Sequence, residues 1–141
     1  MELMVEREEV WIASLEDKPG ALGAKLAALA DSGADLDFVI ARRSPDRPGT
    51  GVMFVTPLRG DAELKAASGI GFSAANRLHS LRVEGENVKG LAGKISGRLG
   101  EAGINLRGFS GAVIGKRFVL HIAFDTTDLQ EKAIRVIKGM T

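Results

Sequence analysis

One segment near the N-terminus decides the fold, and it reads Leu15-Glu16-Asp17-Lys18-Pro19-Gly20-Ala21-Leu22. The apolar and partly β-branched residues 9–15 are typical of a strand, and an acidic turn with Pro-Gly follows them. Apolar residues then recur at helical spacing as far as Asp31, and Gly33 is a typical helix end. The segment therefore predicts a strand, a tight turn and a helix in succession.

The same arrangement returns later in the chain as Gly85-Glu86-Asn87-Val88-Lys89-Gly90-Leu91-Ala92. Gly20 and Gly90 are 70 residues apart, and Gly33 and Gly103 share that offset. We interpret the chain as one module used twice, with a first domain at 1–76 and a second at 77–141. The junction is not rich in Pro or Gly, so we expect the two units to pack without a flexible linker.

Each unit shows the element order β-α-β-β-α. In the first unit we expect a helix that ends at Asp31, a helix at 61–68, and strands at 9–15, 35–43 and 51–56. In the second unit we expect helices at 88–102 and from Asp128 onward, and strands at 81–85, 104–114 and 118–124. The first of these helices has Leu91, Ile95 and Leu99 on one side, and the last strand has Phe118, Leu120, Ile122 and Phe124 on one face. Asp17 and Asn87 are candidate helix caps, and Asp128 with Glu131 forms a candidate capping box.

A fourth strand is clear in neither unit. Residues 70–75 are a weak candidate in the first unit, and residues 3–6 can complete the second unit by crossing over. The predicted fold class is α+β, with two ferredoxin-like βαββα(β) units that each carry helices on one face of an antiparallel sheet. We expect these sheets to pair into one extended sheet.

The composition excludes several classes of protein. The 141 residues are 45% hydrophobic and carry a net charge of +1, which gives no electrostatic basis for binding nucleic acid. The absence of cysteine excludes disulfides and thiolate chemistry and fits a cytoplasmic protein. No signal peptide or membrane-spanning segment is predicted, so we expect no membrane partner.

Residues with catalytic or metal-binding potential are scattered. His79 and His121 lack acidic partners at ligand spacing, so we interpret both as structural. No arrangement of nucleophile, base and acid emerges. The sequence therefore predicts a protein that is not an enzyme and that uses no metal and no cofactor.

The two repeated turns carry a family resemblance. The run from Glu16 to Leu22 resembles the entry motif of the ACT domain, and Gly103-Ile104-Asn105-Leu106 is similar to the sequence that closes the first helix of that family. The segment from Gly90 to Leu106 resembles the ACT segments of aspartate kinases. The first copy departs from the pattern at Ala34-Asp35-Leu36, and the second copy departs from it at Lys89.

This resemblance implies a regulatory, allosteric module that binds a small molecule, typically an amino acid, on a ferredoxin-like fold. Members of the family pair side by side, so a homodimer is expected, with ligand between paired domains. The site residues that the resemblance implies are Glu16, Asp17, Lys18, Pro19, Gly20, Ala21, Leu22, Asp35, Leu36, Asp37, Asn87, Val88, Gly90, Leu91, Ile104, Asn105 and Leu106.

Elementary chemistry is compatible with such a site. A helix start leaves N–H groups and a partial positive charge that suit an α-carboxylate. Gly20 and Gly90 allow a ligand to approach the backbone closely. Asp17, Asp35 or Asp37 can accept from an α-ammonium group, and Asn87 or Asn105 can donate and accept.

Two other interpretations stay open at this stage. Helix capping alone explains Asp17 and Asn87 without any ligand. A protein–protein module without ligand, acting as the regulatory subunit of a biosynthetic enzyme, explains the departures at Asp35 and Lys89. An RNA-binding sheet is disfavoured, because Phe54, Phe118 and Phe124 have the neighbours of core residues and the net charge is near zero.

Overall fold

The structure of the chain, a computed structural model, describes residues 2–140. Its contacts divide the chain into two compact units. The N-terminal unit is the segment from Glu9 to Ala75. The C-terminal unit combines the segment up to Glu8 with the segment from Asn76 onward. The division expected from the sequence was 1–76 and 77–141. It differs from the observed one mainly at the N-terminus, because it assigns the residues before Glu9 to the first domain.

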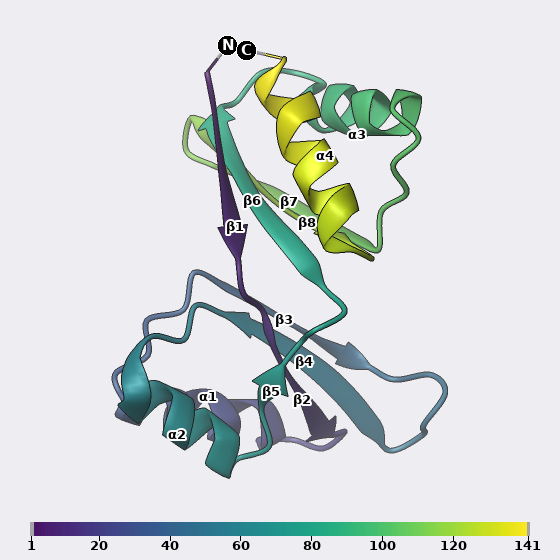
Figure 1. Ribbon diagram of the computed structural model, residues 1–141. Helices are drawn as coiled ribbons and strands as arrows, with labels where there is room; N and C mark the ends of the chain where they lie inside the picture. The colour runs from purple at the N-terminus through teal and green to yellow at the C-terminus, as the bar shows by residue number, and fades with distance from the viewer. Residues whose placement is uncertain (1, 141) are drawn as a thin grey trace. The chain divides into compact units, whose positions relative to one another are not determined.

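The N-terminal unit is a four-stranded antiparallel sheet with two helices. Its elements are β2 (Trp11–Glu16), α1 (Ala21–Asp31), β3 (Phe38–Arg43), β4 (Thr50–Thr56), α2 (Gly60–Gly69) and β5 (Ser73–Ala74). The strands lie in the order β3-β4-β2-β5, and all three pairings are antiparallel. In Figure 1, α1 and α2 lie on the same face of this sheet.

The C-terminal unit repeats this plan with one strand taken from the start of the chain. Its elements are β1 (Leu3–Glu8), β6 (His79–Glu86), α3 (Leu91–Glu101), β7 (Gly108–Ile114), β8 (Arg117–Phe124) and α4 (Thr127–Lys138). The strands lie in the order β1-β6-β8-β7, again antiparallel throughout. Figure 1 shows α3 and α4 on one face of this sheet.

Both strand orders are those of a ferredoxin-like βαββαβ unit, with β5 and β1 in the equivalent outer position. The predicted α+β class is therefore confirmed. The crossing strand at residues 3–6 is also present, because Leu3 to Glu8 pair with Gly85 to Ser80 along the full length of β1. Pairing of the units into one extended sheet stays a prediction.

The core of the C-terminal unit follows the sequence periodicity. Alternate residues of β8, from Phe118 to Phe124, are 4% exposed or less. Leu91, Ile95 and Leu99 of α3 form the buried stripe of that helix, as their spacing predicts. Each fully buried side chain of this size contributes roughly 1.5–3 kcal/mol of transfer free energy. This packing holds α3 against β8 and fixes the position of the turn before α3.

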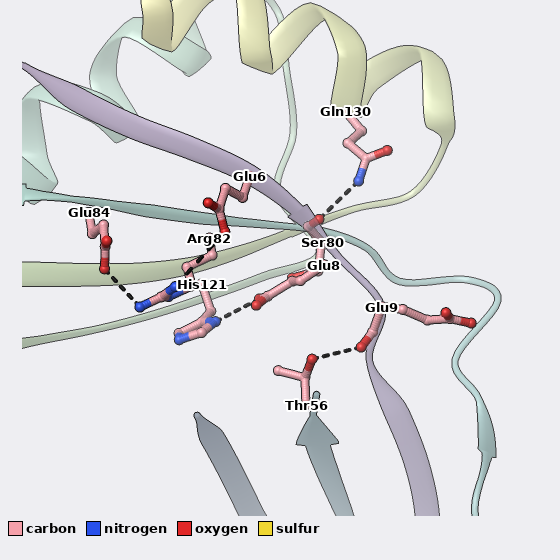
Figure 2. Close-up of polar contacts among 9 residues, drawn as sticks. All are labelled: Glu6, Glu8, Glu9, Thr56, Ser80, Arg82, Glu84, His121 and Gln130. Atoms are coloured by element: carbon pink, nitrogen blue, oxygen red, sulfur yellow. Dashed lines mark hydrogen bonds and ion pairs between the residues drawn. The ribbon is translucent and has the colours of Figure 1, made fainter. Parts of the chain in front are cut away.

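Polar contacts attach β1 to the rest of its sheet (Figure 2). The carboxylate of Glu8 accepts a hydrogen bond from Ser80 Oγ at 3.0 Å and lies 2.6 Å from Nδ1 of His121. Gln130 of α4 donates to the Ser80 carbonyl at 2.9 Å. Three strands therefore meet at Glu8, and α4 is joined to them through Ser80, which explains why the crossing strand ends in a defined place. His121, interpreted from sequence as structural, lies in this network.

The starts of the first helices differ from the sequence prediction. Asp17 and Asn87 are not helix caps, because Gly20 and Gly90 hold the cap positions in the left-handed conformation, at φ 86° and 80°. Pro19 lies in the turn before α1. A left-handed cap is readily adopted only by glycine, so the backbone turn sets the helix start and no side chain caps it.

Three further elements also depart from the prediction. The cap of α4 is Thr126, whose hydroxyl accepts from the Leu129 N–H at 3.1 Å, so the capping box of Asp128 and Glu131 was wrong. Strands β3 and β7 begin later than expected, because the residues after each glycine still belong to the helix end. The Ala34 N–H bonds back to the Leu29 carbonyl, and the Ile104 N–H bonds to the Leu99 carbonyl.

Within residues 2–140, every helix falls short of the length and apolar character that a bilayer-spanning segment needs.

Candidate functional site

A pocket of about 410 Å³ lies in the C-terminal unit, beside the start of α3. The turn before α3 and the first residues of the helix form one wall, and strands β7 and β8 form the other. The lining residues are Asn87, Val88, Lys89, Gly90, Leu91, Ala92, Phe109, Gly111, Ala112, Val113, Phe118 and Leu120. The volume lies in the lower part of the range for small-molecule sites, which is roughly 300–1,000 Å³.

The turn before α3 owes its shape to backbone hydrogen bonds. The Asn87 N–H donates to the Lys116 carbonyl at 2.8 Å, which ties the turn to the hairpin between β7 and β8. The Leu91 N–H donates to the Val88 carbonyl at 3.1 Å and closes the turn. Gly90 then starts the helix without a side-chain cap. The first N–H groups of α3 are consequently not satisfied by a capping side chain, and the helix dipole adds a partial positive charge there.

The strand wall of the pocket follows from the position of β7 at the edge of the sheet. Every second residue of β7, namely Phe109, Gly111 and Val113, lies on the face of the sheet that is turned toward the helices. The inward-facing residues of β8 lie on the same face. This face is incompletely covered at the edge, since Phe109 is 39% and Val113 57% exposed. Gly111 pairs with Leu120, and a Cβ on Gly111 would lie only 2.5 Å from the Leu120 Cδ2 atom. Glycine at this position therefore leaves room for Leu120.

The pocket is apolar with a positive edge. Lys89 is the charged residue of the lining, and Asn87 is its amide residue. The other side chains that reach the pocket are hydrocarbon, and the lining contains no carboxylate. The arrangement therefore suits a small ligand with an apolar part and a negatively charged or hydrogen-bond-accepting part.

The predicted site residues of the second copy separate into two groups. Asn87, Val88, Gly90 and Leu91 all line the pocket. The closing sequence lies elsewhere: Ile104 is a core residue at 4% exposure, and Leu106 packs against the same core. Asn105 is exposed, and its Oδ1 accepts from the Leu106 N–H at 3.1 Å. None of these three residues is part of the pocket lining.

The acidic turn of the first copy has its charges paired internally. Lys18 Nζ lies 2.7 Å from Glu16, and the hydrogen bond and charge of Lys18 lower the pKa of the Glu16 carboxyl. The same pair raises the pKa of Lys18. Asp17 accepts from Arg43 Nε at 2.9 Å, and its N–H donates to the Gly49 carbonyl. These charges therefore have partners within the unit.

The remaining predicted site residues of the first copy lie in the turn before α1, in the core or on the surface of the N-terminal unit. Pro19 and Gly20 form the turn, Ala21 opens α1, and Leu22 packs against the core of this unit. Leu36 also packs against that core, while Asp35 and Asp37 are exposed. The Asp37 N–H donates to the Thr56 carbonyl at 2.9 Å.

Sequence reasoning missed most of the strand wall. The alternation of β8 predicts that Phe118 and Leu120 face inward, but it indicates core residues and not a site. Phe109, Gly111, Ala112 and Val113 carried no signal, because the sequence does not show that β7 is an edge strand. Lys89 was noticed only as a departure from the family pattern, yet it lines the pocket.

A second hollow of about 520 Å³ adjoins the same turn. It is lined by Glu2, Met4, Glu86, Val88 and Arg117. Val88 thus lines both hollows. The second hollow is more polar, because Glu2, next to β1, and Glu86, at the end of β6, are among its lining residues. It matches no group of residues predicted from the sequence.

The fold and the pocket together define a protein of two ferredoxin-like units, one of which has a small-molecule-sized pocket at a glycine-started helix. The family model of the ACT domain matches residues 79–137, which cover most of the C-terminal unit. The predicted resemblance to the ACT domain is therefore confirmed for this segment of the chain. Among curated proteins, no sequence match reached significance.

Solved structures resemble the chain over nearly its whole length. A protein from Bacteroides thetaiotaomicron superposes with a TM-score of 0.79 at 17% identity, over 96% of this chain and 90% of that chain. The ligand-free regulatory subunit of aspartate kinase from Thermus thermophilus gives a TM-score of 0.64 at 17% identity, over 97% and 95%. A structure of aspartokinase alpha and beta subunits gives 0.65 at 22% identity, with the same coverage. At these identities the likeness shows the shared fold of both units.

Proposed function

We propose that the protein is a non-catalytic regulatory protein that binds a small molecule, an amino acid, through its ACT fold. The observation that carries this proposal is the pocket formed by the turn at 87–92 and the strand wall of β7 and β8. Two structurally similar proteins are regulatory subunits of aspartate kinase, which supports a regulatory role for the same fold here.

The geometry supports an amino acid as the ligand class. The α-carboxylate can accept from the uncapped N–H groups of α3, which also carry the positive end of the helix dipole. The amide oxygen of Asn87 can accept from an α-ammonium group. The hydrocarbon surfaces of β7 and β8 can then cover the side chain.

Regulation would follow from the place of the pocket at the edge of the sheet. Strand β7 is the last strand of its sheet, and its exposed side chains border the pocket. A second ACT unit added to this edge, as in a homodimer, would cover the pocket and place the ligand at a domain–domain interface. A ligand that binds only the covered arrangement shifts the population toward it, which is the physical basis of allosteric control.

A thermal-shift screen of the purified protein against the twenty amino acids tests this proposal. A ligand that binds only the native state stabilises it by about 2.7 kcal/mol at a hundredfold excess over its dissociation constant. The expected result is a clear rise in melting temperature with one amino acid or with a few chemically similar amino acids. No shift at millimolar concentration with any of them would contradict the proposal.

A specific observation favours a second candidate, a ligand-free module that binds an enzyme as its regulatory subunit. Phe109, Val113 and Ile114 are large apolar side chains of β7 and are 39%, 57% and 69% exposed. An unpaired edge strand with exposed apolar residues is a typical surface for pairing with another chain. Sedimentation of the protein with a purified aspartate kinase, without amino acids, distinguishes the two: a stable complex together with a flat screen favours this candidate.

A further inference from the structure

We propose that the pocket beside α3 selects small carboxylates that carry a branched or aromatic hydrocarbon group, and rejects ligands with a charged side chain. This inference rests on the proposed ligand-binding function and adds to it a class of ligand. It follows from the chemistry of the pocket lining in this chain.

The strand wall accounts for the hydrocarbon part of the ligand. Phe109, Val113, Phe118 and Leu120 supply this wall, and Val88 and Leu91 face it from the turn and the helix. Burial of a hydrocarbon group against them is favourable in proportion to the apolar area removed from water. Phe109 and Val113 are themselves partly exposed, so an apolar ligand group also removes their surfaces from water.

The same wall disfavours charged side chains. A ligand ammonium group, such as that of lysine, would find no carboxylate in the pocket lining. A second ligand carboxylate, such as that of aspartate, would have to compete with the first for one positive edge. A charge that loses its hydration without gaining a partner destabilises the complex.

The carboxylate end of the ligand is assigned to Lys89 and the start of α3. Gly90 holds the cap position and has no side chain, so no side-chain oxygen competes with a ligand for the first helix N–H groups. The start of α4 differs, because the Thr126 hydroxyl already accepts there. The Lys89 ammonium and the helix dipole both attract a negative group at this edge.

The chemistry that this site recognises is shared by two kinds of metabolite. Apolar amino acids and their 2-oxo acids both combine a carboxylate with a branched or aromatic group. They differ at the α-position, where only the amino acid can donate to the Asn87 amide oxygen. Leucine and 4-methyl-2-oxopentanoate differ only at the α-position, where leucine carries an ammonium group and the other compound an oxo group. Asn87→Ala removes the amide oxygen that would accept from this ammonium group.

Isothermal titration of the full chain with leucine, 4-methyl-2-oxopentanoate, lysine, aspartate and leucinamide tests the inference. The expected result is that leucine or its 2-oxo acid binds at least tenfold more tightly than lysine and aspartate. Leucinamide, which lacks the carboxylate, should also bind at least tenfold more weakly than leucine. Preference for leucine over the 2-oxo acid, lost in Asn87→Ala, identifies the amino acid as the ligand class, and the reverse preference identifies the 2-oxo acid.

Substitution of Lys89 tests whether its ammonium group binds the ligand carboxylate. Lys89→Met should weaken binding of the preferred carboxylate about tenfold, whereas Lys94→Met, an exposed lysine one turn further along α3 and outside the pocket lining, should not change it. Equal binding by Lys89→Met and the parent protein overturns the assignment of the carboxylate.

The possible failures are distinguishable. Tighter binding of lysine or aspartate than of leucine overturns this inference and leaves the proposed function intact. No binding by any amino acid or 2-oxo acid overturns both.

Discussion

The Asn87 N–H donates a hydrogen bond of 2.8 Å to the Lys116 carbonyl, and this contact holds the turn before α3 against the hairpin of β7 and β8. The N-terminal unit contains the same relationship, because the Asp17 N–H donates to the Gly49 carbonyl at 3.1 Å. The repeated sequence therefore produces a repeated contact between the helix-start turn and the following hairpin. In the C-terminal unit this contact joins the two walls of the pocket.

The hairpin residue Gly115 should tolerate substitution poorly. Its φ of 62° lies in the left-handed region, where an L-residue costs about 1–2 kcal/mol. Gly115→Ala should lower the free energy of unfolding by about that amount, as measured by urea denaturation. Gly97→Ala is the control: it lies in α3 with no atom within 4 Å of the added Cβ, so it should stabilise by about 0.5–1 kcal/mol. Equal effects of both changes would contradict this account of the hairpin.

Loss of the Glu8 carboxylate should weaken the attachment of the crossing strand. Glu8→Ala removes the carboxylate that accepts from Ser80 Oγ and lies 2.6 Å from His121 Nδ1, so we expect a loss of about 1–3 kcal/mol in the free energy of unfolding. Glu9→Ala is a matched control, because the Glu9 side chain is exposed and only its backbone carbonyl accepts a hydrogen bond, from Thr56. An unchanged stability of Glu8→Ala would show that the network does not anchor β1.

The Glu16 carboxyl should titrate below its ordinary range. Its pKa is lowered by the hydrogen bond and charge of Lys18, so the favourable contribution of the pair is present above the ordinary carboxyl pKa and is lost as the pH falls through the lowered value. Lys18→Met should raise the pKa of Glu16 toward its ordinary value, as measured by NMR titration of the side-chain carbon. Because the two side chains are 64% and 72% exposed, little change in stability should accompany this shift. An unchanged pKa in Lys18→Met would contradict the pairing.

Ligand binding should depend on the second copy and not on the first. Phe109 and Val39 are 70 residues apart, lie on edge strands of their units, and are both 39% exposed. Phe109→Ala removes part of the pocket wall and should weaken ligand binding about tenfold, whereas Val39→Ala should leave it unchanged. Isothermal titration of both variants measures this difference. If Val39→Ala weakens binding and Phe109→Ala does not, the site lies in the first copy.

Much of the fold could be predicted because apolar periodicity and glycine placement are local properties. The alternation from Phe118 to Phe124 and the stripe of Leu91, Ile95 and Leu99 both predicted the buried faces correctly. The sequence indicated the crossing of β1 only as one way to complete the second unit. An apolar pattern can identify a strand, but it does not show with which strand that strand pairs. The helix caps were wrong at Asp17 and Asn87 because the left-handed glycine that follows outweighed the preference for an acidic or amide cap.

The candidate site was only half accessible to sequence reasoning. The turn residues Asn87, Val88, Gly90 and Leu91 were indicated by the repeated motif. The strand wall depends on long-range order in the sheet, which places β7 at an edge and leaves Phe109 and Val113 partly exposed. No local pattern around these residues distinguishes an edge strand from a central one.

The central claim is that the pocket at the start of α3 binds a small carboxylate, and NMR mapping tests it most directly. Backbone amide spectra of the labelled protein are recorded while leucine, or the strongest ligand of the thermal-shift screen, is added. The account predicts saturable shifts at Val88 to Ala92 and along β7 from Phe109 to Val113, with smaller changes in the N-terminal unit. Shifts confined to the N-terminal unit, or their absence at millimolar ligand, would contradict it.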